Sequence, residues 1–168
     1  MKEDISSVPY VTPFGKAAVR KQGLQVTVVA TSYTAIEALE AASYLEERGI
    51  SVEVIDLRSI VPLDMDTILE SIRKTRKLIV VDTGHLFCGI SAEIVAQVSE
   101  IDLICKTRRI GLPAAPTPTS HALEKVYYPD TNSIINACYD MLDIPNGKRE
   151  FPKLLPTKEI IANFKGPF

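Results

Sequence analysis

Short apolar runs alternate with longer amphipathic segments along most of this chain, and no other feature restricts its fold as strongly. Four runs rich in Val, Ile and Leu predict buried β-strands, at residues 26–31, 51–57, 77–81 and around 109–112. A helical segment separates each pair of neighbouring runs. Strands that alternate with helices in this way predict an α/β fold, in which a mostly parallel sheet carries helices on both faces.

The helical segments carry their own start and stop signals. Thr34, with Glu37 three residues later, predicts a capping box for a helix that ends at Gly49. Asp64 predicts the cap of the next helix, whose first turn is acidic and whose last turn is basic, in the order that the helix dipole favours. An apolar stripe at helical spacing predicts a final helix that begins near Asp130.

The chain length of 168 residues permits one ordinary domain. Residues 1–24 are expected to form an approach arm, because Pro9 and Pro13 interrupt regular structure there. Residues 25–143 contain the alternating pattern and form the predicted domain. Residues 144–168 are rich in proline and are expected to form an extended C-terminal tail that wraps a neighbour or stays mobile.

Charge and cysteine content exclude several classes of protein. The net charge of −2 and the pI of 5.7 offer no basic face for nucleic acid, and no apolar run approaches the ~18 residues of a membrane span. Cys88, Cys105 and Cys138 are odd in number, widely spaced and set in apolar stretches, which predicts buried free thiols in a reducing compartment. The polar N-terminus shows no targeting signal. We therefore expect a cytoplasmic protein with no nucleic-acid or membrane partner.

The sequence contains no self-contained catalytic motif. It lacks both glycine-rich phosphate loops, the zinc-type spacing of His and Cys, and the G-x-S-x-G motif of serine hydrolases. The triplet at residues 82–84, Asp-Thr-Gly, occurs in aspartic proteases, but those enzymes are all-β. In an α/β chain the triplet instead predicts a turn at the end of a strand.

Three residues near strand ends are candidate contacts. His85 follows the carboxyl end of a strand, where sites in α/β proteins form, and is a candidate acid, base or anion contact, with a surface or interface role as the alternative. Asp82 and Arg58 join it as candidate interface or anion contacts. No residue is assigned to catalysis, cofactor binding or metal ligation.

An ordered set of motifs resembles one known family. Residues 8–17 and 25–29 resemble the entry into the C-terminal domain of transketolase-like beta subunits, and residues 52–64 (VEVIDLRSIVPLD) resemble that family's most recognisable segment. Across residues 8–143 the chain resembles the beta subunit of the thiamine-diphosphate-dependent decarboxylating component of 2-oxo acid dehydrogenases, of the pyruvate, branched-chain or acetoin type. Further matching pieces lie at residues 67–75, 89–94, 118–120, 123–124 and 128–129.

The resemblance implies a three-layer α/β/α domain with a five-stranded mixed sheet, in which one strand runs antiparallel to the others. It also implies that thiamine diphosphate and Mg are held by domains of the parent enzyme that this chain does not contain. The chain is then expected to bind no cofactor and not to be catalytic alone. The implied partners are a second copy through the same domain, an alpha subunit, and the lipoyl acyltransferase of the complex.

The chain departs from the family pattern in three places. At residues 82–85, Asp-Thr-Gly-His stands where the family has an acidic residue followed by small ones, so different loop contacts are expected. Met1 stands where the domain begins, so either a split-gene product or an excised domain is expected. The tail from Ile144 runs past the usual end of the family.

One functional hypothesis and two alternatives follow. The first is a subunit-assembly and partner-docking domain of a 2-oxo acid dehydrogenase decarboxylase beta subunit, supporting oxidative decarboxylation of a 2-oxo acid such as pyruvate. The second is the corresponding domain of transketolase or deoxyxylulose-phosphate synthase. The third is a stand-alone anion or small-molecule binding module that uses His85.

Overall fold

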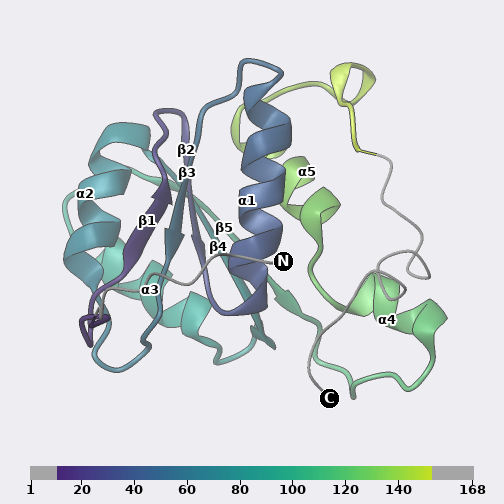
Figure 1. Cartoon of the computed structure of the whole chain (residues 1–168), viewed down its shortest axis with the longest axis horizontal. Helices are drawn as coiled ribbons and strands as arrows, with labels where there is room; N and C mark the ends of the chain where they lie inside the picture. The colour runs from purple at the N-terminus through teal and green to yellow at the C-terminus, as the bar shows by residue number, and fades with distance from the viewer. Residues whose placement is uncertain (1–10, 153–168) are drawn as a thin grey trace.

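The computed structural model describes residues 11–152, apart from the side chain of His121 (Figure 1). The first ten residues of the predicted arm and residues 153–168 of the predicted tail lie outside this range. Within it, no helix is both long enough and apolar enough to cross a membrane. The elements in chain order are β1 (Ala18–Lys21), β2 (Val26–Ala30), α1 (Tyr33–Glu46), β3 (Val52–Asp56), α2 (Met65–Thr75), β4 (Lys77–His85), α3 (Ile90–Ser99), β5 (Lys106–Leu112), α4 (His121–Tyr127), α5 (Thr131–Met141) and the 3₁₀ helix η1 (Asn146–Lys148).

The strands form a single mixed sheet in the order β1-β3-β2-β4-β5. β1 pairs with β3 in the antiparallel sense, whereas β2 is parallel to both β3 and β4, and β4 is parallel to β5. Every residue of β2 is buried, because helices cover both faces of this central strand. The predicted five-stranded, mostly parallel sheet is confirmed.

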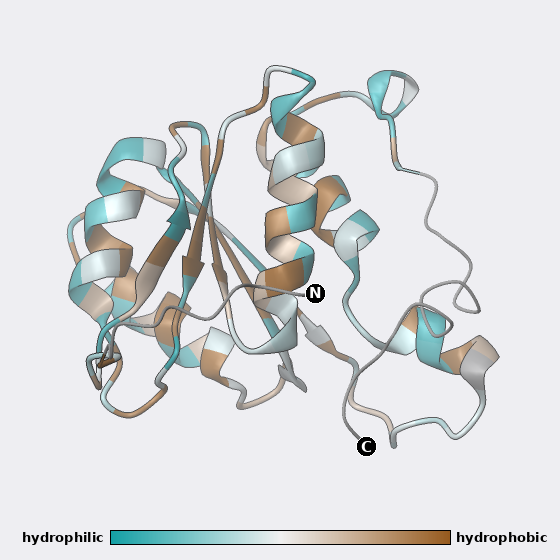
Figure 2. Ribbon diagram, viewed as in Figure 1, coloured by the Kyte–Doolittle hydropathy of each residue, from teal (hydrophilic) through white to brown (hydrophobic). Residues whose placement is uncertain are grey.

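Helices lie on both faces of the sheet, with α1 and α5 on one side and α2 and α3 on the other (Figure 1). Figure 2 shows apolar residues along the strands and on helix faces, with hydrophilic residues interspersed around the helices. Each face has its own core, and the alanines of α1 let that helix approach the sheet closely. This arrangement is the predicted three-layer α/β/α fold. The first core includes Ala38, Ala42, Leu45, Ile134 and Cys138, and the second includes Ile55, Ile68, Ile72, Ile94 and Val98.

The antiparallel strand β1 lies inside the segment that the sequence predicts as an approach arm. Its four residues include one large apolar side chain, Val19, which is itself 39% exposed, so no apolar run marks this strand. β1 is held by its pairing with β3 and by Arg20, which donates two hydrogen bonds to the Asp56 carboxylate at 3.2 and 3.0 Å. Tertiary pairing, rather than hydrophobic patterning, makes this segment a strand.

The predicted cap at Asp64 is confirmed, and the helix predicted to begin near Asp130 begins at Thr131 with Asp130 as its cap. The Asp64 side chain accepts a hydrogen bond from the backbone amide of Thr67 at the start of α2. The Asp130 side chain accepts one from the backbone amide of Ser133, and the Ser133 hydroxyl accepts one from the backbone amide of Asp130, which completes a capping box at the start of α5. Each cap satisfies an amide that has no partner inside the helix.

The capping box predicted at Thr34 and Glu37 is wrong. α1 begins at Tyr33, and the Thr34 hydroxyl is buried, where it donates to the Thr31 carbonyl at 2.7 Å. Glu37 does not bond back to the start of its own helix. Its carboxylate instead accepts hydrogen bonds from the backbone amide and hydroxyl of Thr131 at the start of α5. Glu37 therefore joins two helices instead of capping its own.

The described part of the predicted tail packs against α5. The Tyr139 hydroxyl donates to the Glu150 carbonyl at 2.9 Å, and the Tyr139 ring meets Phe151 edge-on with ring centroids 5.9 Å apart. Arg149 pairs with Asp140 at 2.7 Å. Up to residue 152, the chain therefore does not leave the domain as the extended arm that its prolines predict, because these side chains find partners on α5.

The cysteines form no disulfide, and their burial differs from the prediction. Cys138 is buried in the first core as expected, but Cys105 is half-buried and Cys88 is exposed. Cys88 lies in the turn between β4 and α3 and has a φ of 55°, so its backbone follows a tight left-handed bend at the surface. Its apolar sequence neighbours therefore reflect a surface turn and not a core.

Candidate functional site

The carboxyl ends of β2 and β4 are the place where this topology predicts a ligand site. The chain leaves β2 towards β3 on one side, and β4 lies on the other side, so the connections diverge between β2 and β4. Open α/β sheets bind ligands outside such a point. Here the Thr31 hydroxyl donates to Asp82 Oδ1 at 2.7 Å, so a hydrogen bond joins the two strand ends.

Asp82 is engaged with the sheet. Its Oδ1 atom accepts the Thr31 hydrogen bond, and a Cβ atom placed on Gly84 would lie 2.7 Å from its Oδ2 atom, so residue 84 must lack a side chain for Asp82 to keep this rotamer. The turn predicted at residues 82–84 is instead a continuation of β4, with irregular pairing to β5 between Val81 and His85. The turn comes later, because β5 keeps pairing with this segment.

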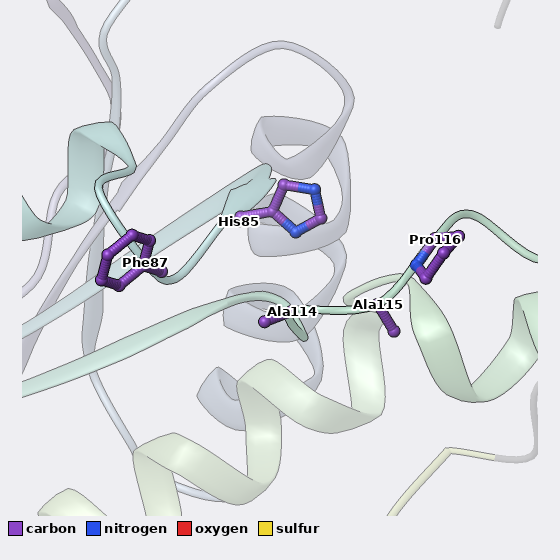
Figure 3. A pocket seen from close by; sticks show the side chains of 5 residues that line it. All are labelled: His85, Phe87, Ala114, Ala115 and Pro116. Atoms are coloured by element: carbon purple, nitrogen blue, oxygen red, sulfur yellow. The ribbon is translucent and has the colours of Figure 1, made fainter.

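His85 faces a shallow hollow at the end of β4. Its Nδ1 atom lies 2.9 Å from the Pro113 carbonyl, which can only accept a hydrogen bond, so Nδ1 carries the proton and Nε2 is the free acceptor of the neutral ring. The hollow has a volume of about 360 Å³ and is lined by His85, Phe87 and residues 114–116. Figure 3 shows the His85 ring between Phe87 and the segment that carries Ala115 and Pro116.

A second hollow, of about 450 Å³, adjoins the same loop. It is lined by Phe87, Leu86, Cys88, Ala92 and Arg109, so Phe87 lines both hollows. The Phe87 side chain is 81% exposed. Sequence reasoning missed this residue, although a large aromatic side chain between the end of a strand and a glycine is the signal that could have indicated it.

Arg58 is not brought together with His85. It follows β3, which is separated from β4 by β2, and it lines neither of the two hollows. Its φ of 57° places it in a tight left-handed turn, and its backbone amide donates to Asp56 Oδ1 at 3.2 Å. The three predicted contacts thus lie along one edge of the sheet without forming a single cluster.

The surface around His85 provides a shallow hollow and one hydrogen-bond acceptor, and it contains no acid–base pair. Asp82 points back to Thr31, and the other side chains that line the His85 hollow are Phe, Ala and Pro. Among the described residues, no three His, Cys, Asp or Glu side chains gather closely enough to hold a metal ion. The donor set in residues 11–152 therefore does not fit a Mg ion with a diphosphate.

Residues 15–134 match the family described as Transketolase, C-terminal domain. The chain belongs to this family. The match covers all five strands of the sheet and the helices α1 to α4, and it includes both hollows and the strand ends that Thr31 and Asp82 join. The resemblance inferred from residues 8–143 is confirmed.

Curated relatives of this C-terminal domain include longer beta subunits. The beta subunit of acetoin:2,6-dichlorophenolindophenol oxidoreductase from Bacillus subtilis is 38% identical over 86% of this chain and 43% of its own length. The beta subunit of the pyruvate dehydrogenase E1 component from Rickettsia bellii is 42% identical over 81% of this chain and 44% of its own length. The chain thus spans less than half the length of these relatives.

Two solved structures have similar folds. A split gene transketolase, described as an inactive beta4 tetramer, superposes with a TM-score of 0.72 at 27% identity, over 83% of this chain and 48% of that one. A 2-oxoglutarate:ferredoxin oxidoreductase from Magnetococcus marinus superposes with a TM-score of 0.53 at 16% identity, over 76% of this chain and 19% of that one. The second likeness concerns the fold alone.

Proposed function

We propose that this chain is the subunit-assembly and partner-docking domain of the beta subunit of a 2-oxo acid dehydrogenase decarboxylase component. The observation that carries the proposal is the identity of 35–42% to beta subunits of pyruvate and acetoin enzymes over more than four fifths of the chain. The parent enzyme would decarboxylate a 2-oxo acid such as pyruvate oxidatively. The alternative relationship, to a transketolase, has a 27% identical structure in its favour.

The chemistry of the site supports a role outside catalysis. The His85 hollow contains no paired acid and base, and Asp82 is engaged by Thr31. In the parent enzyme, thiamine diphosphate and its Mg ion would therefore be held by residues outside this chain, and the chain alone would be inactive. The cofactor would supply the electron sink for decarboxylation, while this domain would fix the subunits relative to one another.

Self-association is the first part of the proposed assembly role. The split gene transketolase structure is described as an inactive beta4 tetramer, and the superposition with this chain covers 48% of that chain. A domain of the same fold is therefore expected to pair with a second copy of itself. Obligate interfaces of this kind commonly bury more than ~2,000 Å² in total.

The second part of the role is contact with other subunits. We expect an alpha subunit and a lipoyl acyltransferase to bind the assembled beta chains, in a cytoplasmic complex. The absence of disulfides among the three cysteines is compatible with such a reducing compartment.

Affinity capture of the tagged chain from its source, followed by mass spectrometry of the intact captured proteins, tests the proposal. An alpha subunit and a lipoyl acyltransferase among the companions are the expected result. A companion set that acts on sugar phosphates and not on 2-oxo acids would assign the chain to the transketolase group. Capture of the 168-residue chain without any such companion would contradict the docking role.

A further inference from the structure

Two basic segments of the chain meet at the amino ends of β4 and β5. The first is residues 73–77 (Arg-Lys-Thr-Arg-Lys), which end α2 and begin β4, and the second begins with Lys106 at the start of β5. Lys77 and Lys106 are paired residues of the parallel β4–β5 ladder, and the Lys106 amide donates to the Arg76 carbonyl at 3.0 Å. The fold therefore places together cations that lie far apart in the sequence.

Three of these cations carry charge that the domain itself does not neutralise. Lys74 pairs with a buried carboxylate at 2.7 Å, and Lys106 pairs with an exposed one at 2.8 Å. In contrast, no carboxylate of residues 11–152 forms an ion pair with Arg73, Arg76 or Lys77. Arg73 and Arg76 are exposed and Lys77 is half-buried, so these three side chains form a basic face that a partner can reach.

The basic face is held on a fixed backbone. Arg76 ends α2 in the left-handed conformation, and its amide donates to the Ile72 carbonyl at 2.9 Å. Burial raises the pKa of the Cys105 thiol, whereas the charges of Arg76 and Lys77 lower it, so both charges act on the same nearby side chain. A partner would therefore lose little entropy in ordering the backbone that carries these charges.

An exposed apolar side chain lies beside the basic face. Ile104 is 91% exposed and precedes Lys106 by two residues in the loop that leads into β5. Protein interfaces commonly combine an apolar centre with a polar rim. Ile104 and the basic face together have this composition.

The surroundings of the basic face favour one class of partner. Exposed carboxylates flank it at Glu70, Asp102 and Asp143. A continuous phosphate backbone or a flat anionic membrane would bring negative charge against these carboxylates as well as against the cations. A protein segment can place its carboxylates opposite the cations alone. Neither of the two hollows includes a residue of the basic face, so a small anion finds no recess there among them.

We infer that the basic face and Ile104 dock an acidic protein segment, whose carboxylates lie opposite the three cations and whose apolar side chain covers Ile104. The inference rests on the docking role proposed above and gives it a surface and a partner chemistry. Complementary charge steers association and selects the partner, and salt screens it. Binding at this face is therefore expected to weaken as the salt concentration rises.

Fluorescence anisotropy of a labelled peptide titrated with the full chain tests the inference. The probe contains leucines flanked by paired glutamates, and the control probe has glutamine in place of each glutamate. Arg73→Glu is the test variant, and Lys148→Glu is the matched control, because Lys148 is exposed in η1 and the two variants change the net charge equally. Circular dichroism and thermal melting establish that both variants fold.

The acidic peptide is expected to bind the wild type, and the glutamine peptide is not. We expect Arg73→Glu to raise the Kd for the acidic peptide by about fivefold or more, and Lys148→Glu to change it by less than about twofold. Ile104→Ser is expected to raise the Kd by about threefold. An unchanged Kd in Arg73→Glu or in Ile104→Ser would overturn the inference.

Phosphate-bearing probes distinguish the partner class. A thymidine oligonucleotide and phosphatidylglycerol vesicles are titrated under the same conditions. Weaker binding of both than of the acidic peptide is the expected result. Tighter binding of either, with the same loss in Arg73→Glu, would assign the basic face to phosphates and overturn the inference.

Affinity capture separates this inference from the proposed function. We expect Arg73→Glu to recover less of an alpha subunit or of a lipoyl acyltransferase than Lys148→Glu recovers. Equal recovery of both companions by the two variants would overturn the basic face as the docking surface and leave the docking role intact. Capture of neither companion by the wild type would contradict the proposed function, and the peptide titration would then decide on the basic face by itself.

Discussion

Glu53 places a carboxylate inside the core, on the face of the sheet that α2 covers. It is 1% exposed, and it accepts hydrogen bonds from Lys74 Nζ at 2.7 Å and from the Gly23 amide at 3.1 Å. Burial by itself would raise the pKa of this carboxyl, but hydrogen bonds from Lys74, Ser71 and the Gly23 amide bring the pKa below its ordinary value. The fold therefore stabilises the ionised form.

Replacement of Glu53 by Ala is expected to lower the free energy of unfolding by about 2–4 kcal/mol. The reason is that the Gly23 amide loses its acceptor at a buried position, while Lys74, whose side chain is 40% exposed, loses its ion-pair partner. Chemical denaturation measures the change, with Glu70→Ala on the exposed side of α2 as the control, which should stay within about 0.5 kcal/mol of wild type. Equal stability of the two variants would refute the assigned role.

The same carboxylate makes stability depend on pH in the acid range. Because the folded-state pKa of Glu53 lies below its ordinary value of 4.5, its contribution is complete above the unfolded-state pKa and is lost as the pH falls through the folded-state value. Below about pH 4.5, we expect the Tm of the wild type to fall more steeply than that of Glu53→Gln. Superimposable Tm profiles for the two proteins would contradict this.

At the scale of elements, the turn between β1 and β2 depends on close backbone contact. A Cβ atom on Gly23 would lie 2.1 Å from the Glu53 amide nitrogen and 2.2 Å from the Val52 carbonyl carbon, so no side chain fits there. Gly147, in contrast, has no neighbour within 4 Å of such an atom. The two glycines therefore form a matched pair of test positions.

Gly23→Ala is expected to destabilise the domain by more than about 2 kcal/mol, because β1 must move away from β3 to make room. Gly147→Ala should change the free energy of unfolding by less than about 0.5 kcal/mol. Thermal denaturation distinguishes the two outcomes. A neutral Gly23→Ala would mean that β1 is not seated on β3 in solution.

Asp64 joins two elements that are far apart in sequence. Its carboxylate accepts hydrogen bonds from the Thr67 hydroxyl at 2.8 Å in α2 and from the Ala17 amide at 3.0 Å just before β1. Burial tends to raise the pKa of this carboxyl, but these hydrogen bonds, together with one from Lys16, hold it below its ordinary value. The cap of α2 is also the anchor of the chain that enters the sheet.

Asp64→Ala is expected to cost about 2 kcal/mol and to speed hydrogen exchange of the Ala17 amide by roughly tenfold. Asp66→Ala removes a neighbouring acid from the same first turn and serves as the control, since Asp66 is exposed. NMR measures the hydrogen-exchange rate of the Ala17 amide in both variants. An unchanged rate at Ala17 in Asp64→Ala would show that the entry strand is held by other contacts.

At the scale of the whole molecule, the proposed assembly role predicts self-association. A domain that assembles subunits is expected to expose an apolar face when it is alone, and to cover that face with a second copy. We therefore expect the full chain to form a dimer at high micromolar concentration. Sedimentation velocity over a range of concentrations checks this, and a strict monomer at high micromolar concentration would contradict it.

Much of the architecture could be predicted because local patterns and burial agree. β2, β3 and β4 are apolar runs that the fold covers on both faces. The cap at Asp64 and the start of α5 next to Asp130 depend on residues only a few positions away. β1 could not be predicted in this way, because it has an exposed face and depends on β3 for its hydrogen bonds.

The site was harder to predict than the fold. His85 was singled out from its place after a strand, and it does line a hollow, but Asp82 is engaged by Thr31 and Arg58 lies beyond β2. Phe87 was not singled out at all. Its place between the end of a strand and a glycine could have drawn attention to it, but the sequence does not show whether the fold buries an apolar residue there. The exposure of Phe87 follows from the turn around it.

The sequence by itself determined the three-layer α/β class and the family, because apolar periodicity and an ordered set of motifs are properties of neighbouring residues. Only the tertiary structure decided which strand runs antiparallel, where Glu37 makes its hydrogen bonds, and that Phe87 stands between two hollows. The physical reason is the distance along the sequence between the residues that interact. Hydrogen bonds and contacts between residues tens of positions apart depend on how the elements pack, and that packing is settled by the whole chain together.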